Sequence, residues 1–445
     1  MTGTTRTLAR YVLASDFDAT PEAVRHEAVR SLINWTGCAI AGAHHATVET
    51  AMAALIPFSG PAQAQIVGRA ERLDILSAAL INGMASAVLD FDSTQFKHTN
   101  IHPSGPVLPA VLALSEFKPT SGAEALHAFL LGVEIACRLA NVVFGPANPG
   151  WHVTGAVGAI GAAAAAGRLL GLDEDKMVAA LGIAATQPGG LREMYGTMCK
   201  SFTPGRAAGN GLMAALLAEK GFDSAARPIE GSMGLAKVLA GATELSGLTE
   251  GLGEEFEISF NIYKPFACAI VLHPIADGCI GLRNAHGLKA ADIDKVALRV
   301  NPNVLKLAGK EEPVTGLEGK FSFTHATALA IVHGAAGEAE FGDEPLADPE
   351  VAALRPRISA TPDDAIAKDE VHIAITLADG RVLARHVEHA LGSLENPMSD
   401  ADIAAKFRSL AAGVLTQTRI DGLLKMCWDA AELEDAGAIA RATAP

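Results

Sequence analysis

The sequence predicts a mainly α-helical protein, with a large all-helical domain and a smaller α/β domain. Apolar residues recur at helical spacing from residue 20 to residue 265, and again after residue 398. Between these stretches, short runs alternate between apolar and polar residues, which is typical of strands. We therefore assign residues 1–266 and 398–445 to the helical domain and residues 267–397 to the α/β domain.

Helix-capping residues mark the starts of several segments in the helical domain. Thr20 precedes Pro21, which suits a first helical turn, and Ser121 and Asp173 stand before other periodic runs. Ala and Gly recur three or four residues apart in these runs, so we expect tight crossings between buried helices. The expected helices cover residues 21–42, 47–55, 75–89, 109–114, 122–142, 153–170, 173–185 and 205–220.

The α/β domain is predicted from strand-like alternation around one tight turn. Asp379-Gly380 lies between two alternating segments and predicts a β-hairpin. Two helices are expected to cover one face of the sheet, and the helical periodicity from residue 400 returns the chain to the first domain. The expected elements are strands at residues 296–300, 371–377 and 382–386, helices at residues 273–285 and 323–337, and a loop at residues 345–364.

The composition excludes several classes of protein. The 445 residues carry 50 acidic and 35 basic side chains, a net charge of −15, whereas a nucleic-acid-binding surface needs a basic excess. Hydrophobic residues make up 49% of the chain but aromatic residues only 5%, which suits closely packed helices. An anionic substrate would need a locally positive pocket, so lysines and histidines within apolar sequence become the candidates.

Cysteine usage and the absence of targeting signals predict an intracellular protein. The six cysteines form no CxxC pair and lie mostly among apolar residues, as in reduced cytoplasmic proteins. The N-terminal segment lacks the apolar core and cleavage site of an export signal. The most continuous apolar run, residues 155–167, is too short to span a bilayer. We expect a cytoplasmic protein that binds neither membranes nor nucleic acids.

The segment Leu89–Ala110 is the richest in groups that can do chemistry. It places Asp90, Asp92, His98 and His102 between two apolar segments, so we expect a loop whose polar side chains face a pocket or are paired. Helix capping explains such residues equally well on local grounds. The two histidines and two aspartates also offer typical metal ligands. The proline after His102 disfavours a shared helix face, so a metal site is the weaker alternative.

Four other places set ionisable residues among small or apolar neighbours. They are His152, Lys200, Lys264 with His273, and His325. Taken singly, each has an ordinary structural explanation, as a satisfied core histidine or a solvated lysine. Together they supply acid/base groups near neutral pH and clamps for carboxylates, which proton removal beside a carboxylate requires. The sequence has no P-loop, no GxGxxG after a strand and no GxSxG, which excludes kinase, dehydrogenase and common serine-hydrolase functions.

Six segments that span nearly the whole chain carry a family resemblance. They are NGMASAVLDFDST, HPSGPVLPA, GWHVTGAVGA, GTMCKSFTPGRAAGNGLMAALLAEKGF, KPFACAIVLHPIADG and GSLENPMSDADIAAKF. In these segments the sequence resembles the MmgE/PrpD family, which includes 2-methylcitrate dehydratase, cis-aconitate decarboxylase and iminodisuccinate epimerase. The resemblance implies a helical domain built from both chain ends, an α/β lid domain, a homodimer, and a site between the domains that uses no cofactor.

The same resemblance implies which residues of the helical domain face the pocket. Asp90 and Thr94 fall on the family's DFDDT pattern, and His102 falls on the histidine of its HPSG pattern. His152 corresponds to the histidine of the GxHxTG turn, and Lys200 to the lysine after GTxxK. All five are therefore expected in the site.

Further positions concern the end of the helical domain and the lid. Lys264 and His273 lie on the family's KP...HP segment. His325 stands where the decarboxylase branch has a tyrosine in an SFxY pattern, and Ser93 stands where the family often has a second aspartate. A histidine both accepts and donates protons near neutrality, whereas a tyrosine mostly donates, so His325 favours an outcome other than decarboxylation.

We expect a cofactor-independent lyase acting on a small di- or tricarboxylate, with dehydration of the 2-methylcitrate type favoured. The alternatives are decarboxylation of the cis-aconitate type, epimerisation of a dicarboxylate such as iminodisuccinate, and a non-catalytic metabolite-binding scaffold. His102 and His152 are the expected acid/base pair, Asp90 orients His102 or tunes its pKa, and Lys200 holds a carboxylate. The expected substrate-binding residues are Thr94, Lys264, His273 and His325, and no metal ligand is expected.

Overall fold

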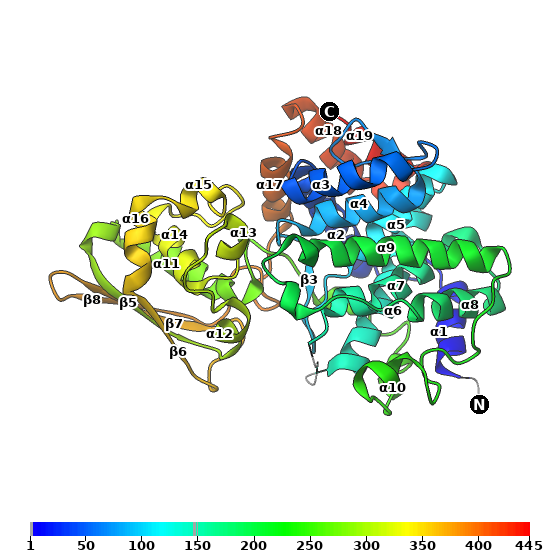
Figure 1. Cartoon of the computed structure of the whole chain (residues 1–445), viewed down its shortest axis with the longest axis horizontal. Coiled ribbons are helices and arrows are strands. Elements are labelled where there is room, and N and C mark those ends of the chain that lie inside the picture. The colour runs from blue at the N-terminus through cyan, green and yellow to red at the C-terminus, as the bar shows by residue number, and fades with distance from the viewer. Residues whose placement is uncertain (1–2, 146–147, 149) are drawn as a thin grey trace.

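The protein forms two lobes of unequal size, as Figure 1 shows. It is described from a computed structural model, in which residues 3–145, 148 and 150–445 are placed. Helices make up the larger lobe, and the smaller lobe contains a four-stranded sheet with helices packed on it. The larger lobe contains extensive apolar cores, and a separate core is built mainly from residues of the smaller lobe. The fold is therefore mainly α with a smaller α/β part, as predicted.

The larger lobe, here called the helical lobe, is built from both ends of the chain. Its C-terminal helices pack on its N-terminal ones, α17 and α18 against α2, and α19 against α5. The chain thus returns to this lobe after the α/β part. Its helices are α1 (Thr4–Ala14), α2 (Glu22–Gly42), α3 (Ala46–Leu55), α4 (Ile75–Ala87), α5 (Ser104–Phe117), α6 (Gly122–Leu139), α7 (Val153–Leu170), α8 (Glu174–Ala185), α9 (Met198–Glu219), α10 (Leu235–Ala240), α17 (Asp400–Ala411), α18 (Gln417–Trp428) and α19 (Gly437–Ala442).

Small residues allow the helices of this lobe to approach one another closely. Where α6 meets α7, a Cβ atom added to Gly132 would lie 2.7 Å from the carbonyl oxygen of Gly161. Where α4 meets α9, a Cβ atom added to Gly83 would lie 2.7 Å from the Cα of Gly205. Such distances leave no room for a side chain in a close-packed interior. The tight crossings expected from the Ala and Gly spacing are therefore present.

The smaller lobe, here called the α/β lobe, has a sheet of strand order β6-β5-β7-β8. Its first pair, β5 (Ile293–Val300) with β6 (Ile358–Pro362), is parallel, and the other pairs are antiparallel. The predicted hairpin joins β7 (Val371–Leu377) to β8 (Val382–Val387), and Gly380 in its turn has a φ of 87°. Alternate residues of β7 are buried, and α11 packs against β7 and β8. The helices of this lobe are α11 (His273–His286), α12 (Asn303–Ala308), α13 (Gly316–Gly319), α14 (Phe323–Val332), α15 (Asp343–Leu346) and α16 (Pro349–Leu354).

Two short strand pairs lie outside this sheet. One pairs β1 (Ala64–Gln65) with β2 (Arg72–Leu73). The other pairs β3 (Thr94–Gln95) with β4 (Asn261–Ile262), so that the polar loop after α4 is fastened to the segment that leads into the α/β lobe.

Two helices near the polar loop begin earlier than the sequence predicted. α5 begins at Ser104 rather than residue 109, and α9 begins at Met198 rather than residue 205. Each contains an internal proline, Pro109 or Pro204, which interrupts the helical signal because proline removes a backbone hydrogen bond. Both prolines are buried among packed helices, and this packing outweighs the lost bond. As a result, the segment around residue 200 lies in the first turn of a helix.

The prediction of a loop at residues 345–364 is wrong. This stretch contains the end of α15, all of α16 and β6. Asp348 caps α16 by accepting a hydrogen bond from the backbone N–H of Glu350, and Val351 and Leu354 are buried in the core of the lobe. Helices this short are stabilised by tertiary contacts, which is why their sequence signal is weak.

Two helical stretches of the described chain are long and apolar enough to cross a membrane by length and composition. They are residues 122–144 and Val153–Leu170, and 89% of the apolar window in each is buried inside the protein. Burial of this extent is also found in the core helices of globular domains.

Candidate active site

The polar loop between α4 and α5 carries one half of the candidate site. It runs from Val88 to Pro103, and most of its polar side chains are buried. Asp90 in this loop has a φ of 53°, and it is the one non-glycine residue with positive φ in the described part of the chain. An L-residue adopts this conformation only where its surroundings hold it there.

Three buried lysines from distant parts of the chain hold this backbone in place. Each ammonium group donates a hydrogen bond to one of three successive carbonyl groups. The pairs are Lys320 with Leu89 (2.6 Å), Lys264 with Asp90 (2.8 Å) and Lys406 with Phe91 (2.7 Å). Lys320 belongs to the α/β lobe, Lys264 to the segment after β4, and Lys406 to α17. The loop conformation therefore depends on tertiary contacts, and the sequence reasoning missed the parts played by Lys320 and Lys406.

The carboxylate of Asp90 lies between two ammonium groups. The Nζ atom of Lys200 is 2.5 Å from one carboxylate oxygen, and the Nζ atom of Lys264 is 3.0 Å from the other. Burial raises the pKa of Asp90, but the two ammonium groups outweigh this effect and hold its pKa well below its usual range. Burial lowers the pKa of Lys200, and Asp90 and Asp92 more than reverse that shift. Asp90 and Lys200 are therefore both charged at neutral pH.

His102 is held by the polar loop through Ser93 and Thr94, and the carboxylate near its ring is that of Asp92 rather than that of Asp90. Its Nδ1 atom lies 3.0 Å from the carbonyl oxygen of Ser93, 3.2 Å from the hydroxyl of Thr94 and 3.3 Å from the carboxylate of Asp92. Burial lowers the pKa of His102 below its ordinary value, although Asp92 opposes that shift. The sequence reasoning gave an orienting role to Asp90, whose carboxylate is occupied by the two lysines.

His152 stands at the N-cap position of α7, as the sequence predicted for a ring at the start of this helix. Its Nδ1 atom lies 2.5 Å from the hydroxyl of Thr203 on α9, and its Nε2 atom is buried without a hydrogen-bond partner. The rings of His152 and His102 have centroids 6.4 Å apart, and the ring of Tyr195 lies 5.6 Å from that of His152. Burial, and then the charge of Lys200, hold the pKa of His152 well below its ordinary value.

Several of these groups meet at one cavity between the two lobes, although His152 is not among the residues that line it. Its volume is about 60 Å³, room for roughly two water molecules. Five of the eight predicted site residues line it, namely Asp90, Thr94, His102, Lys200 and Lys264. The sequence reasoning missed Arg192 and Tyr195, which lie in a turn before α9, and Phe321, which comes from the α/β lobe. Arg192 stands close in the sequence to Lys200, which was predicted to lie in the site, and this proximity was the signal that could have indicated it.

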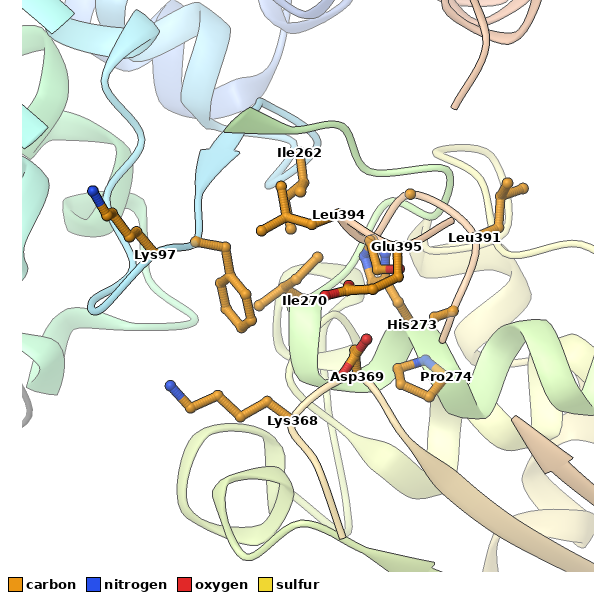
Figure 2. A pocket seen from close by; sticks show the side chains of 14 residues that line it. Lys97, Ile262, Ile270, His273, Pro274, Lys368, Asp369, Leu391, Leu394 and Glu395 are labelled. Atoms are coloured by element: carbon orange, nitrogen blue, oxygen red, sulfur yellow. The ribbon is translucent and has the colours of Figure 1, made fainter. Parts of the chain in front are cut away.

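His273 lies at a second cavity, which Figure 2 shows from close by. This cavity has a volume of about 340 Å³ and is lined by His273, Ile270 and Lys368, among others, while Ile270 also borders the first cavity. The His273 ring is buried, and its Nε2 atom lies 3.3 Å from the carbonyl oxygen of Cys268. Burial lowers its pKa to about 3. His273 is therefore next to the candidate site and does not line it, contrary to the expectation.

His325 lies away from both cavities. Its ring is fully buried against Phe341, and neither ring nitrogen has a hydrogen-bond partner. Burial, and then the charge of Arg355, lower its pKa to about 4. The expectation that His325 binds substrate is not supported by this position, because the side chain faces the core of the α/β lobe. The lobe contributes Phe321 to the cavity instead.

The loop also contains three groups of types that bind metals, Asp90, Asp92 and His102, whose ligand atoms lie within 4.8 Å of one another. Both carboxylate oxygens of Asp90 already bind ammonium groups. A cation would have to displace Lys200 and Lys264 and would then lie beside their positive charges. His98, the other histidine of the metal alternative, is not in this group. The arrangement is suited to binding an anion rather than a cation.

Known proteins resemble the chain over most of its length. The model of the MmgE/PrpD N-terminal domain matches residues 6–247, and that of the MmgE/PrpD C-terminal domain matches residues 266–430. Cis-aconitate decarboxylase of Aspergillus terreus is 28% identical over 436 residues, which cover 91% of this chain and 88% of that protein. Cis-aconitate decarboxylase of Homo sapiens is 29% identical over 388 residues, covering 82% and 78%.

A more distant relative is 2-methylcitrate dehydratase of Cupriavidus necator, which is 24% identical over 444 residues, covering 91% of this chain and 89% of that protein. Decarboxylases and dehydratases of this kind are both lyases. The chain belongs to the MmgE/PrpD family and is an enzyme of this lyase type.

Proposed function

We propose that this lyase acts on a small tricarboxylate without a cofactor, and that decarboxylation of cis-aconitate or a close analogue is its first candidate reaction. The observation that carries the proposal is the convergence of two buried ammonium groups, on Lys200 and Lys264, with the ring of His102 around one cavity, while the ring of His152 lies 6.4 Å from that of His102. This is the set of groups that proton transfer beside a carboxylate requires.

Substrate binding follows from the charges. Lys200, Lys264 and the guanidinium of Arg192 border the cavity, and Asp90 balances only part of their charge. In a buried site, ammonium and guanidinium groups bind carboxylates strongly. The α/β lobe supplies Phe321 to the lining, so the substrate binds between the two lobes.

Proton transfer falls to the two histidines. Burial lowers the pKa of both and keeps them neutral, and a bound tricarboxylate adds negative charges that raise their pKa values. In decarboxylation, the bond to one carboxylate breaks and its electron pair forms a new double bond. The original double bond shifts its electrons to the carbon beside a second carboxylate, and that carbon takes a proton. Lys200 and Lys264 stabilise the charge on the second carboxylate, and His152 or His102 delivers the proton.

Two observations favour decarboxylation over the dehydration expected from the sequence. The decarboxylases of Aspergillus terreus and Homo sapiens are 28% and 29% identical to the chain, against 24% for the dehydratase. The argument for dehydration was the histidine at position 325, and this residue lies outside the cavity. Dehydration is kept as the second candidate because two neutral histidines also suit the removal of a proton from carbon.

The decisive experiment offers the purified protein cis-aconitate, citrate, 2-methylcitrate and iminodisuccinate in deuterated buffer and follows the products by NMR. Decarboxylation gives a product one carboxylate smaller, with one deuterium at the carbon that received the proton. Dehydration gives an alkene with the carbon skeleton retained, and epimerisation gives deuterium exchange without elimination. If no member of the panel is turned over or raises the melting temperature, the tricarboxylate proposal is wrong. His152→Asn protein serves as the inactive control.

The homodimer implied by the resemblance is also part of this proposal. Light scattering during size-exclusion chromatography measures it directly, and a mass of about twice the 45.9 kDa of one chain is expected.

A further inference from the structure

A group of three side chains on the outer face of the sheet is unrelated to the candidate active site. His372 of β7 and His386 of β8 are directly opposite each other in the antiparallel register. Their rings are stacked, with centroids 4.1 Å apart and planes inclined by 2°. Glu370, just before β7, places one carboxylate oxygen 3.4 Å from Nε2 of His372 and 2.8 Å from Nε2 of His386. The Nε2 atoms of both rings thus point to the same carboxylate oxygen of Glu370.

The separations are close to those of a tetrahedral metal site, with the Glu370–His372 distance at 3.4 Å and the Glu370–His386 distance, a hydrogen bond, at 2.8 Å. An ion with bonds of about 2.1 Å to nitrogen and oxygen places neighbouring ligand atoms about 3.4 Å apart. The three ligand atoms of this group lie within 4.8 Å of one another, and the two parallel rings must rotate out of their stack so that both nitrogen lone pairs point at one ion. Two imidazoles and one carboxylate are a common ligand set of zinc, and a fourth position stays open to water.

The surroundings do not oppose a cation at this place. The side chains of His372 and His386 are 39% and 46% exposed, so an ion reaches them from solvent. Arg299, which is opposite His372 on β5, is paired with Asp363 at 2.6 Å. No lysine or arginine within the described residues forms an ion pair with Glu370, in contrast to Asp90 in the cavity.

We propose that Glu370, His372 and His386 bind a divalent transition metal ion of the zinc type, which links the edge strand β8 to β7. The site needs neither the cavity nor any residue of the proposed reaction. Because β8 is an edge strand whose side chains are mostly exposed, its hydrogen bonds to β7 open more readily than those inside the sheet. A bound ion stabilises the paired state, since the separated strands cannot supply all three ligands.

Zinc binding to chelator-treated, full-length protein tests the proposal by competition with a chromophoric chelator. We expect His372→Ala and His386→Ala to weaken zinc binding at least tenfold each, and Glu370→Gln to weaken it less. His286→Ala, which removes another exposed histidine of the α/β lobe, is the matched control and should bind like the wild type. Magnesium, which prefers oxygen ligands, should not compete.

A second measurement locates the ion. Zinc should slow hydrogen exchange at the backbone amides of β8 in the wild type and leave it unchanged in His386→Ala protein. Zinc binding that survives both histidine substitutions, or that is lost only with His389→Ala in the neighbouring group of Asp369, His389 and Glu395, would overturn the assignment. Both readouts are independent of catalytic activity.

Discussion

Two pairs of buried histidines behave differently in this protein. His102 lines the cavity between the lobes, and the ring of His152 lies 6.4 Å from the ring of His102. Each has a hydroxyl group within hydrogen-bonding distance of its Nδ1 atom. His273 and His325 are more fully buried than His102, but the ring of His325 has no hydrogen-bond partner and His273 uses one ring nitrogen only. Burial lowers the pKa of all four. A shifted pKa therefore does not identify an active site here, whereas convergence on shared charges and a cavity does.

The largest effect on activity should come from disrupting the ion pairs of Asp90 with Lys200 and Lys264, which lie beside the pair His102 and His152. Lys200→Met removes one of the two ammonium groups on Asp90. We expect kcat/KM to fall by about 10²–10³-fold, the usual effect of losing a preorganised charge. The free energy of unfolding should fall by about 3 kcal/mol because a buried pair loses one partner. Steady-state kinetics and urea unfolding measure the two quantities.

Lys310→Met is the control for that substitution, because Lys310 forms an exposed pair with Glu318. It should change the free energy of unfolding by less than about 1 kcal/mol. Activity of Lys200→Met within threefold of the wild type would show that Asp90 and its lysines are structural only.

The second prediction concerns the lysines that hold the loop backbone. Lys406 donates to the side chain of Asn34 and to the carbonyl oxygens of Phe91 and Lys264. Lys406→Met leaves these buried acceptors without a donor, at a cost of about 1–3 kcal/mol in the free energy of unfolding. We expect kcat to fall by about tenfold, as a small displacement of Asp90 weakens substrate positioning, with little change in KM. A loss of stability without any change in kcat would limit Lys406 to a structural role.

The third prediction distinguishes Asp92 from Asp90. Burial lowers the pKa of His102, and the carboxylate of Asp92 is the largest opposing influence. Asp92→Asn removes that influence, so the pKa of His102 should fall further. The acid limb of the pH profile of kcat/KM should then move to lower pH if His102 must be neutral for activity. An unchanged acid limb would assign that limb to another group.

The smallest effect on activity should come from a substitution in the other histidine pair, His273 and His325. His325→Leu removes an unpaired buried imidazole from the core of the α/β lobe, and kcat/KM should stay within about twofold of the wild type. Burial lowers the pKa of His325 from an ordinary value of 6.5 to about 4. In the wild type, the contribution of the neutral His325 ring to the free energy of unfolding is therefore complete above pH 6.5. It is lost as the pH falls towards 4, because the unfolded chain takes up the proton first.

Between pH 6.5 and 4, the free energy of unfolding of the variant should therefore fall by about 2–3 kcal/mol less than that of the wild type. Thermal or urea unfolding at several pH values measures this difference. A strong loss of activity in His325→Leu would restore the substrate-binding role expected from the sequence.

Much of the fold was predictable because its signals are local. Periodicity, the caps at Ser121 and Asp173, and the Asp379-Gly380 turn all identified real elements. The early starts of α5 and α9 were missed because Pro109 and Pro204 are poor helix residues that packing nevertheless tolerates. The short elements at residues 343–362 were missed because their stability comes from contacts rather than from propensity.

The candidate site was predictable to a lesser extent. Motif resemblance found Asp90, Thr94, His102, Lys200 and Lys264, and the structure brings all five to one cavity. The same reasoning misplaced two histidines of the α/β lobe and discounted the aspartate nearest to His102. A motif specifies residue types along the chain, but the direction of a side chain depends on the packing of the elements around it.

The sequence by itself determined the family, the division into helical and α/β parts, and the types of chemical group present, because each of these depends on local residue patterns or motifs. Only the tertiary structure decided which charges meet. Asp90 keeps its left-handed backbone because Lys320, Lys264 and Lys406, from three distant segments, bind three successive carbonyl groups around it. The contacts of Lys264, Lys320 and Lys406 link residues that are 174, 231 and 315 positions apart, and no local signal specifies such pairings.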